Sequence, residues 1–231
     1  MKKMINPHFC LFLKILFKTV FLILFCALFC ACIGISMDIT IRPDGSGSMV
    51  LEYKVSRLAE SLGKLDGNER WNTIPVGRAD FERSMARLPR LSLASFSSSD
   101  NGTDVITRAE ITYKNPEDIL AFLEPSKDGG RASFKKENGK NSLFLLIAEA
   151  NQNISADAVS LANHAFSGYS LNFSLNVPGT AALAVTDAAG VKISNPPKSI
   201  QIIPQGKKVS VTMDTAELFN LTDGLGLEFS W

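Results

Sequence analysis

Hydrophobic and polar positions alternate along most of the chain after residue 32. In 33–41, IGISMDITI, isoleucine or methionine occupies every second position, and small or polar residues occupy the others. A period of two predicts a half-buried β-strand. The pattern repeats in 48–55, and the segment between the two runs, RPDGSG, is rich in turn-forming residues. The sequence therefore predicts a β-hairpin that begins immediately after residue 32.

Further alternating runs predict most of the remaining chain as strand. Two more hairpins are expected over 90–113 and 131–150, because each contains an Asn-Gly pair, which favours a tight turn between antiparallel strands. From residue 169 onward the chain is mainly strand. The runs expected there are 169–177, 181–186, 191–194, 199–203, 208–213 and 225–231.

Helical spacing of apolar residues predicts four or five short helices between the strands. They are expected near 57–65, 79–88, 116–123, 155–167 and 215–221. The third has a clear start, because Asn115 is a good N-cap and Pro116 fits the first helical position. Together these elements predict an α+β fold with a largely antiparallel, hairpin-rich sheet. We expect a single domain over 32–231, whose strand-rich C-terminal part is 169–231.

Residues 1–31 have the composition of a secretory signal peptide. Four lysines precede an apolar, uncharged run over 19–31, and no acidic residue occurs before residue 32. The 13 residues of this run lie within the ~7–15 of a signal-peptide core. A membrane-spanning helix needs about 20 apolar residues, a length reached here only by including Gly34, Ser36 and Met37. An uncleaved membrane anchor is the alternative to a cleaved signal.

The cysteines at the end of this run indicate where the signal is cut. Only Cys32 follows a small residue, Ala31, whereas Cys26 and Cys30 follow phenylalanine. The segment FCAC therefore resembles a lipobox, in the loose form found in spirochaete lipoproteins. Cleavage before Cys32 would leave this residue at the start of the mature chain, carrying diacylglycerol and a further acyl group such as palmitate, and two chains suffice for stable anchoring. The alternative is ordinary cleavage after Ser36, which would release a soluble periplasmic protein.

Charge and residue content exclude several classes of function. Of 24 basic and 23 acidic residues, four basic ones precede Cys32, so the rest of the chain has a net charge of about −3, which gives no reason to expect nucleic-acid binding. Only His164 remains after the signal, too little for a zinc site of the usual His/Cys type. No nucleophile elbow, phosphate loop or dinucleotide fingerprint occurs. We expect no catalytic residue, metal or cofactor, although paired carboxylates leave glycoside cleavage open.

Two segments are candidates for membrane or ligand contact. The helix near 79–88 carries Arg83 and Arg87 beside an apolar face, which suits anionic headgroups. The loop before it contains Trp71 and Ile74, which would form an exposed apolar tip. The alternative for both is ordinary packing, with solvated arginines on a helix that lies on the sheet and a tryptophan folded back onto the core.

Two motifs carry a resemblance to a known group. The segment DITIRPDGSGSMVLEYKV resembles the opening hairpin of LppM-like bacterial lipoproteins, and LNFSLNVPGT resembles a later strand of that group. The chain departs from the group where KVSVTM replaces a tryptophan-containing strand. The resemblance implies an envelope-anchored α+β domain, with suggested lipid or glycolipid binding and no established catalytic residues. From it we take only the hairpin around Pro43, Asp44 and Gly45, as structure and not as a site.

We therefore expect a membrane-anchored lipoprotein of the cell envelope, facing the periplasm or the outside, that is not an enzyme. In the first hypothesis it binds a lipid or another hydrophobic ligand against the membrane, which predicts an apolar cavity between the sheet and the helices near Asp80 and Pro116. The alternative is a structural lipoprotein that docks another envelope protein, which predicts a well-filled core and an exposed patch around Trp71. An enzyme would need a cleft with clustered, perturbed carboxylates.

Overall fold

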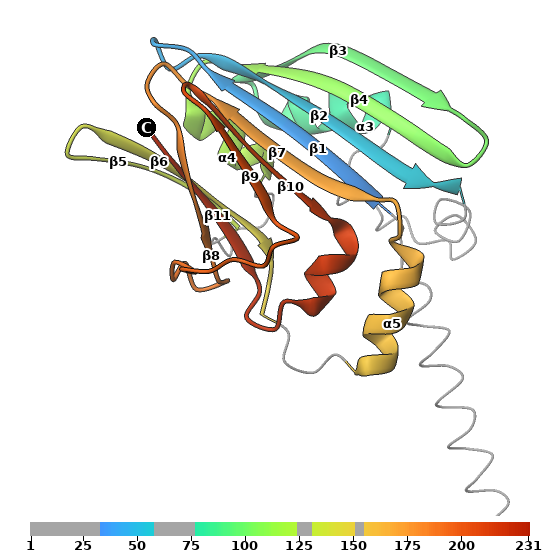
Figure 1. Cartoon of the computed structure of the whole chain (residues 1–231). Coiled ribbons are helices and arrows are strands. Elements are labelled where there is room, and N and C mark those ends of the chain that lie inside the picture. The colour runs from blue at the N-terminus through green and yellow to red at the C-terminus, as the bar shows by residue number, and fades with distance from the viewer. Residues whose placement is uncertain (1–32, 58–76, 124–130, 151–154) are drawn as a thin grey trace, which may run out of the picture.

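The structure, a computed structural model, describes residues 33–57, 77–123, 131–150 and 155–231 (Figure 1). In these residues the chain forms two β-sheets. The seven-stranded sheet has the order β3 (Leu91–Asp100), β4 (Asp104–Tyr113), β2 (Gly47–Ser56), β1 (Ile33–Ile41), β7 (Ser170–Asn176), β10 (Lys208–Asp214) and β9 (Gln201–Gln205). The four-stranded sheet has the order β5 (Ala132–Glu137), β6 (Lys140–Ala148), β11 (Leu225–Ser230) and β8 (Ala182–Thr186).

Antiparallel pairing dominates both sheets. The exception is the pair of β1 and β7, which run parallel in the middle of the large sheet. Parallel neighbours need a crossover connection, and here the chain between them forms the strands and helices from β2 to α5. The predicted α+β class with a largely antiparallel sheet is confirmed. The parallel pair was not predicted, because alternation along a strand does not indicate the strand's neighbour.

Four helices lie in the described residues: α3 (Arg78–Arg87), α4 (Pro116–Leu123), α5 (Ala156–Ala165) and the short 3₁₀ helix η2 (Thr215–Asn220). None of these described helices is both long enough and apolar enough to cross a membrane. The helix expected near 57–65 lies outside the described residues. The strand expected over 191–194 is wrong, since only Lys192 forms an isolated bridge, to Thr186. Val191 is 63% exposed and only Ile193 of this run packs against the core, so little apolar burial holds the run in a sheet.

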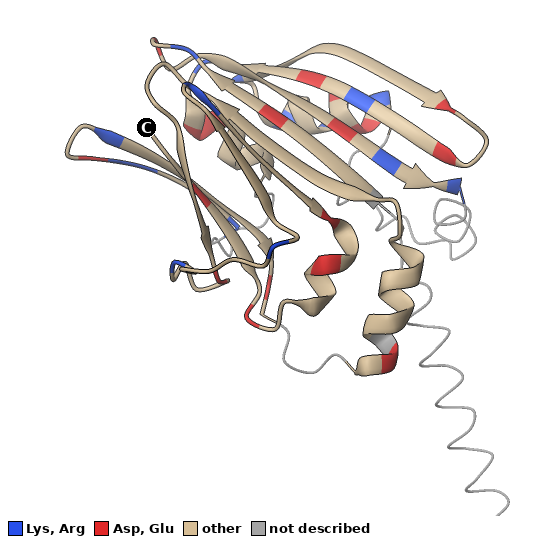
Figure 2. Cartoon of the chain, in the orientation of Figure 1, with Lys and Arg blue, Asp and Glu red and all other residues tan. Residues whose placement is uncertain are grey.

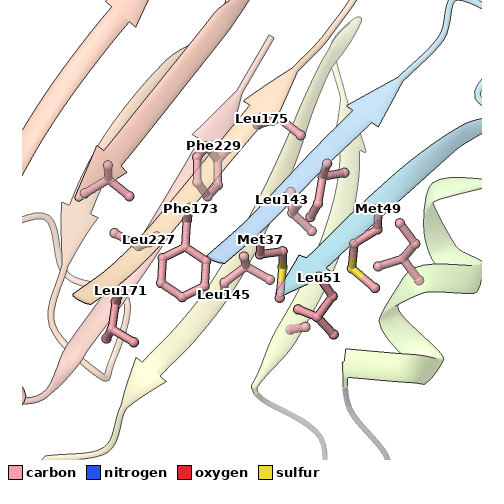
Figure 3. Close-up of a cluster of buried hydrophobic side chains, with 14 of the residues drawn as sticks. Met37, Met49, Leu51, Leu143, Leu145, Leu171, Phe173, Leu175, Leu227 and Phe229 are labelled. Atoms are coloured by element: carbon pink, nitrogen blue, oxygen red, sulfur yellow. The ribbon is translucent and has the colours of Figure 1, made fainter. Parts of the chain in front are cut away.

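The inner faces of the two sheets pack against each other (Figure 3). Met37 of β1 and Phe173 of β7 extend from the large sheet, and Leu145, Leu227 and Phe229 extend from the small one. All five side chains are buried in one hydrophobic cluster. The alternating residues identified in the sequence therefore form the core, and apolar burial of this kind is the main stabilising contribution to folding.

Helices α3 and α4 cover the rest of the inner face of the large sheet, next to β3 and β4. Phe81 of α3 is fully buried, with its ring centroid 5.7 Å from that of Phe96 in β3 and 6.4 Å from that of Phe122 in α4. Met85 of α3 and Ile119 of α4 are buried in the same cluster. One face of the large sheet thus packs on two helices at one side and on the second sheet at the other.

The outer face of the large sheet carries the partly exposed residues that alternate with the buried ones, and charged residues recur along these strands (Figure 2). Glu52 of β2 accepts a hydrogen bond from Arg108 of β4 at 3.1 Å, and Asp38 of β1 accepts one from Lys208 of β10 at 2.8 Å. These charged side chains are at least a third exposed, and surface ion pairs of this kind contribute little to stability. The face is therefore a solvated surface, and the candidate site lies elsewhere.

Candidate ligand-binding site

A cleft of about 280 Å³ opens at one end of the two packed sheets. Its walls come from segments that are distant in the sequence: the β1–β2 turn, the start of α4, the β5–β6 hairpin and the residues after β7 and β11. The charged and aromatic side chains among its lining residues are Arg42, Asp44, Glu117, Phe134, Lys136 and Trp231. The cleft is the open end of the core, at the end of the sheets opposite to the start of β1.

The β1–β2 turn is shaped by Asp44. Its Oδ1 accepts a hydrogen bond from the Ser46 hydroxyl at 2.7 Å and another from the Ser46 backbone N–H at 3.0 Å. Because these bonds favour the carboxylate, the pKa of Asp44 lies below its ordinary value, and the hydroxyl has the largest effect. Gly45 follows with a φ of +85°, which glycine adopts without steric cost. The backbone that presents Arg42 and Asp44 to the cleft is therefore well defined.

Tyr113 of β4 fixes the position of this turn relative to the sheet. Its hydroxyl donates a hydrogen bond to the carbonyl oxygen of Thr40 at 2.8 Å. Gly47 leaves room for this contact, because a Cβ there would overlap both the Thr40 carbonyl oxygen and the Tyr113 ring. Burial raises the pKa of Tyr113 well above its ordinary value, and nearby Arg42 offsets part of that effect. The phenol therefore stays protonated and keeps donating at neutral pH.

The wall formed by the small sheet is aromatic. Trp231, directly after β11, and Phe134 of β5 have ring centroids 5.9 Å apart with planes inclined at 41°. The backbone N–H and carbonyl oxygen of Trp231 pair with those of Asn141 at 3.0 and 2.9 Å, which holds the tryptophan at the sheet edge. In the β5–β6 turn, Asn138 and Gly139 both have positive φ, as the two-residue type I′ hairpin turn requires.

The start of α4 closes a third side. Pro116 occupies the first helical position, as predicted, and Asp118 Oδ2 accepts a hydrogen bond from the backbone N–H of Asn115 at 3.1 Å. Asp118 is buried, and Arg90 Nη1 lies 3.5 Å from its other oxygen. Glu117 is exposed and lines the cleft. A carboxylate in the first helical turn is also favourable for the helix dipole.

This lining suits binding through a polar group that contains a ring. Two aromatic side chains offer apolar faces, and charged groups of both signs offer hydrogen bonds around them. Within the described residues, no three His, Cys, Asp or Glu side chains come together as metal ligands would. His164, the one histidine after residue 32, is exposed in the last turn of α5, away from the cleft.

Of the residues predicted from the sequence as contacts, the two that the structure describes, Arg83 and Arg87, do not line the cleft. Cys32, Trp71 and Ile74 lie outside the described residues. Arg83 and Arg87 are exposed on α3, and Arg83 is 2.6 Å from a carboxylate oxygen of Asp80. Both arginines are thus exposed on a helix that packs on the sheet through Phe81, and membrane or ligand contact by them stays a prediction.

The predicted position of the cavity is only partly right. Near Asp80 the described residues between α3 and the sheet are packed, with Phe81 in contact with Phe96 and Phe122. Near Pro116 there is a cleft, but it lies at the start of α4 and its lining is mixed instead of apolar. The reason is that large aromatic side chains fill the space under the helices, whereas the two sheets leave their common end open.

Sequence reasoning missed the aromatic wall. Phe134 and Trp231 lie in runs that were predicted as strands, but nothing in either run indicates that its end meets the β1–β2 turn. One signal was present: Pro43, Asp44 and Gly45 were recognised as a structured turn, and all three line the cleft.

The fold is similar to the folded domain of LppM from Mycobacterium tuberculosis, solved by NMR. The two chains are 11% identical, and the match covers 87% of this chain and 89% of that chain with a TM-score of 0.46. No protein-family profile and no curated protein sequence matches the chain. The matched domain belongs to the group that the two sequence motifs resemble.

Proposed function

We propose that the chain is a non-catalytic lipoprotein of the bacterial cell envelope, anchored by acylated Cys32, that binds the polar head of an amphiphilic ligand in the end cleft. The observation that carries this proposal is the pairing of Phe134 and Trp231 opposite a turn that presents Arg42 and Asp44. Apolar rings and charged groups on facing walls match the two parts of such a ligand.

The volume of the cleft limits the size of the group that it can hold. Sites that enclose a whole small molecule occupy roughly 300–1,000 Å³, and the cleft has about 280 Å³. It therefore suits a single ring or headgroup, with any acyl chains remaining outside.

The position of the cleft changes the expected relation to the membrane. Cys32 immediately precedes β1, whose nine residues span about 30 Å at ~3.3 Å each. The cleft lies at the other end of this strand, next to Ile41 and Arg42. A ligand in the cleft is thus about one strand length from the anchor. We therefore propose that the ligand is held at the far end of the domain, and no longer directly against the membrane.

The proposal is tested by mass spectrometry of lipids that co-purify with the full chain extracted from membranes in mild detergent. We compare the wild type with Trp231→Ala, and with Leu161→Ala as a matched control, since Leu161 is an exposed apolar residue on α5 outside the cleft. We expect one amphiphile with the wild type and the control and its loss with Trp231→Ala. No amphiphile in the wild type, or equal amounts in all three, would contradict the proposal.

The alternative, a lipoprotein that docks another envelope protein, is supported by the packed interface between α3 and the sheet. It also has a candidate contact in β9, an outer strand of the large sheet with Ile203 46% exposed. Chemical cross-linking in intact cells distinguishes the two functions. A single abundant protein adduct that disappears in Ile203→Glu, together with the absence of co-purified lipid, would favour docking.

The anchor is tested separately. Metabolic labelling with palmitate is expected to mark the wild type and not Cys32→Ala. Equal labelling of both chains would rule out Cys32 as the attachment site, and cleavage after Ser36 would then be the better explanation of the signal.

A further inference from the structure

The end of the molecule that contains the cleft carries a row of basic side chains. Six exposed residues belong to it, and in the described part of the chain none of them has a carboxylate within salt-bridge distance: Arg42, Lys114, Lys135, Lys136, Lys140 and Lys207. We call this set the basic end. Its cations are available to a partner because no intramolecular ion pair among the described residues occupies them.

The backbone places these residues together. Lys114 directly follows Tyr113, whose hydroxyl donates a hydrogen bond to the carbonyl oxygen of Thr40, near the end of β1. Lys136 lines the cleft, and Lys135 and Lys140 belong to the same tight hairpin. The carbonyl oxygen of Lys207 accepts a hydrogen bond from the backbone N–H of Val177, the residue before Pro178, which lines the cleft. Three loop ends of the large sheet and one hairpin of the small sheet therefore meet at this end.

The opposite end, where β1 begins, has a different charge pattern. Its basic residues Lys54 and Arg57 pair with Asp104 and Asp100 of the β3–β4 hairpin. Figure 2 shows further acidic residues there, on η2 and α5. The cations at the anchored end are thus paired within the molecule. At the basic end the six cations stand against three described acidic residues, Asp44, Glu117 and Glu137, so the excess there is positive and attracts an anionic partner to the end away from Cys32.

The extent of the basic end favours a polymer as partner. Lys114 follows β4 and Lys207 precedes β10, which are four strand positions apart in the large sheet. At ~4.8 Å per strand this row is about 19 Å long, more than a single headgroup covers. The lysine hairpin of the second sheet adds a second row at the separation of packed sheets, about 10 Å.

The remaining side chains favour a glycan over a lipid surface. Proteins that lie on a bilayer insert large apolar side chains between headgroups. Among the described residues the exposed large hydrophobic side chains are Leu161, Val191 and Ile203, and none of them belongs to the basic end. The aromatic residues present there, Phe134 and Trp231, instead line the cleft at the lysine hairpin, where they offer flat faces to sugar rings.

We propose that the basic end docks an acidic glycan, a polymer of sugar rings that carry carboxylates, on the side of the molecule away from the membrane anchor. Such a contact would connect the anchored chain to a wall polymer in front of the membrane. The proposal goes beyond the amphiphile in the cleft and does not need it, since Lys114, Lys140 and Lys207 lie outside the cleft lining.

The test is the binding of a fluorescent polygalacturonate oligomer to the full chain in neutral detergent, followed by anisotropy. The test variant is Lys140→Ala/Lys207→Ala. The matched control is Lys192→Ala/Lys198→Ala, which removes two exposed lysines between β8 and β9, at the other end of the strands. We expect roughly five- to tenfold weaker binding in the test variant, at most about twofold in the control, and weakening of wild-type binding by salt.

Three results would overturn the proposal. The first is equal affinity in the test and control variants. The second is equal affinity of the wild type for polyglutamate, a polyanion without rings. The third is displacement of the glycan by detergent micelles that contain phosphatidylglycerol at the same charge concentration, which would assign the basic end to a lipid surface. Loss of co-purified amphiphile is measured separately, so failure of this proposal and failure of the cleft proposal remain distinguishable.

Discussion

The large sheet presents one continuous inner face, but its two halves are covered in different ways. Over β3 and β4, helices α3 and α4 bring Phe81 against Phe96 and Phe122, and the space is filled. Over β1, β7 and β10, a second sheet provides the cover (Figure 3). That half is closed in the middle, where Leu227 and Phe229 are buried, and open at the end next to the β1–β2 turn.

This difference in how the two halves are covered indicates where a cavity can exist in the fold. A helix delivers long side chains from every turn and fills a concave sheet surface. Two twisted sheets pack closely only where they overlap, and beyond the last shared residues their loops leave a cleft. We therefore expect the helical half to contribute mainly to stability, and we place the proposed ligand at the open end of the two-sheet half.

The largest effect is expected in the helical half. Phe81→Ala removes a fully buried ring and should lower the free energy of unfolding by about 3–5 kcal/mol. Phe134→Ala, at the open end, removes a half-buried ring and should cost only about 1–2 kcal/mol. Urea unfolding followed by circular dichroism measures both. Similar losses in the two variants would show that the open end is as tightly packed as the helical half.

A smaller effect is expected behind the cleft. Gly47→Ala places a methyl group against the Thr40 carbonyl oxygen and the Tyr113 ring, so it should destabilise by about 1–3 kcal/mol through overpacking. Gly179→Ala is the control, because a Cβ at Gly179 has open space around it. Thermal unfolding of both variants tests the prediction, and an unchanged midpoint for Gly47→Ala would contradict it.

Substitutions at the start of α4 should lower the free energy of unfolding by a smaller amount. Asp118→Ala removes the acceptor for the Asn115 backbone N–H and should cost about 1 kcal/mol, the usual value of a helix-capping contact. Glu117→Ala, in the same helical turn but exposed, should change stability by less than ~0.5 kcal/mol. If urea unfolding ranks these two variants in the opposite order, Asp118 does not organise this side of the cleft.

A last effect is absent at neutral pH and appears only in alkaline solution. Burial raises the pKa of both Tyr53 and Tyr113 in the folded protein. Above pH ~10 these phenols ionise in the unfolded chain and stay protonated in the folded one, so the unfolded state binds fewer protons and stability falls as pH rises. Chemical denaturation at pH 8 to 11 should show this fall, and Tyr113→Phe should make it shallower. An equal slope in wild type and variant would contradict the assignment.

The strands were predictable from sequence because the alternation of apolar and polar residues within each run indicates which of its side chains are buried. The alternation of Met37, Ile39 and Ile41 with polar residues identifies β1, and Asn138-Gly139 identifies the β5–β6 turn. The cleft was not predictable, because it depends on which strand ends meet. Trp231 and Arg42 come together through the order of strands in two sheets, and no local pattern encodes that order. The arginines of α3 are a different case, because their exposure fits both a solvated helix face and a contact surface, so their contact stays a prediction.

The central claim is that the ligand is held at the open end of the two sheets and not on the arginine face of α3. Photo-cross-linking in intact cells tests it whatever the identity of the ligand. The photoreactive residue p-benzoylphenylalanine is placed either at Lys136, an exposed residue that lines the cleft, or at Arg87, an exposed residue of α3. After irradiation, mass spectrometry of the purified chain should find one amphiphile adduct at position 136 and none at position 87. An amphiphile adduct at position 87 alone, or protein adducts at both positions, would contradict the claim.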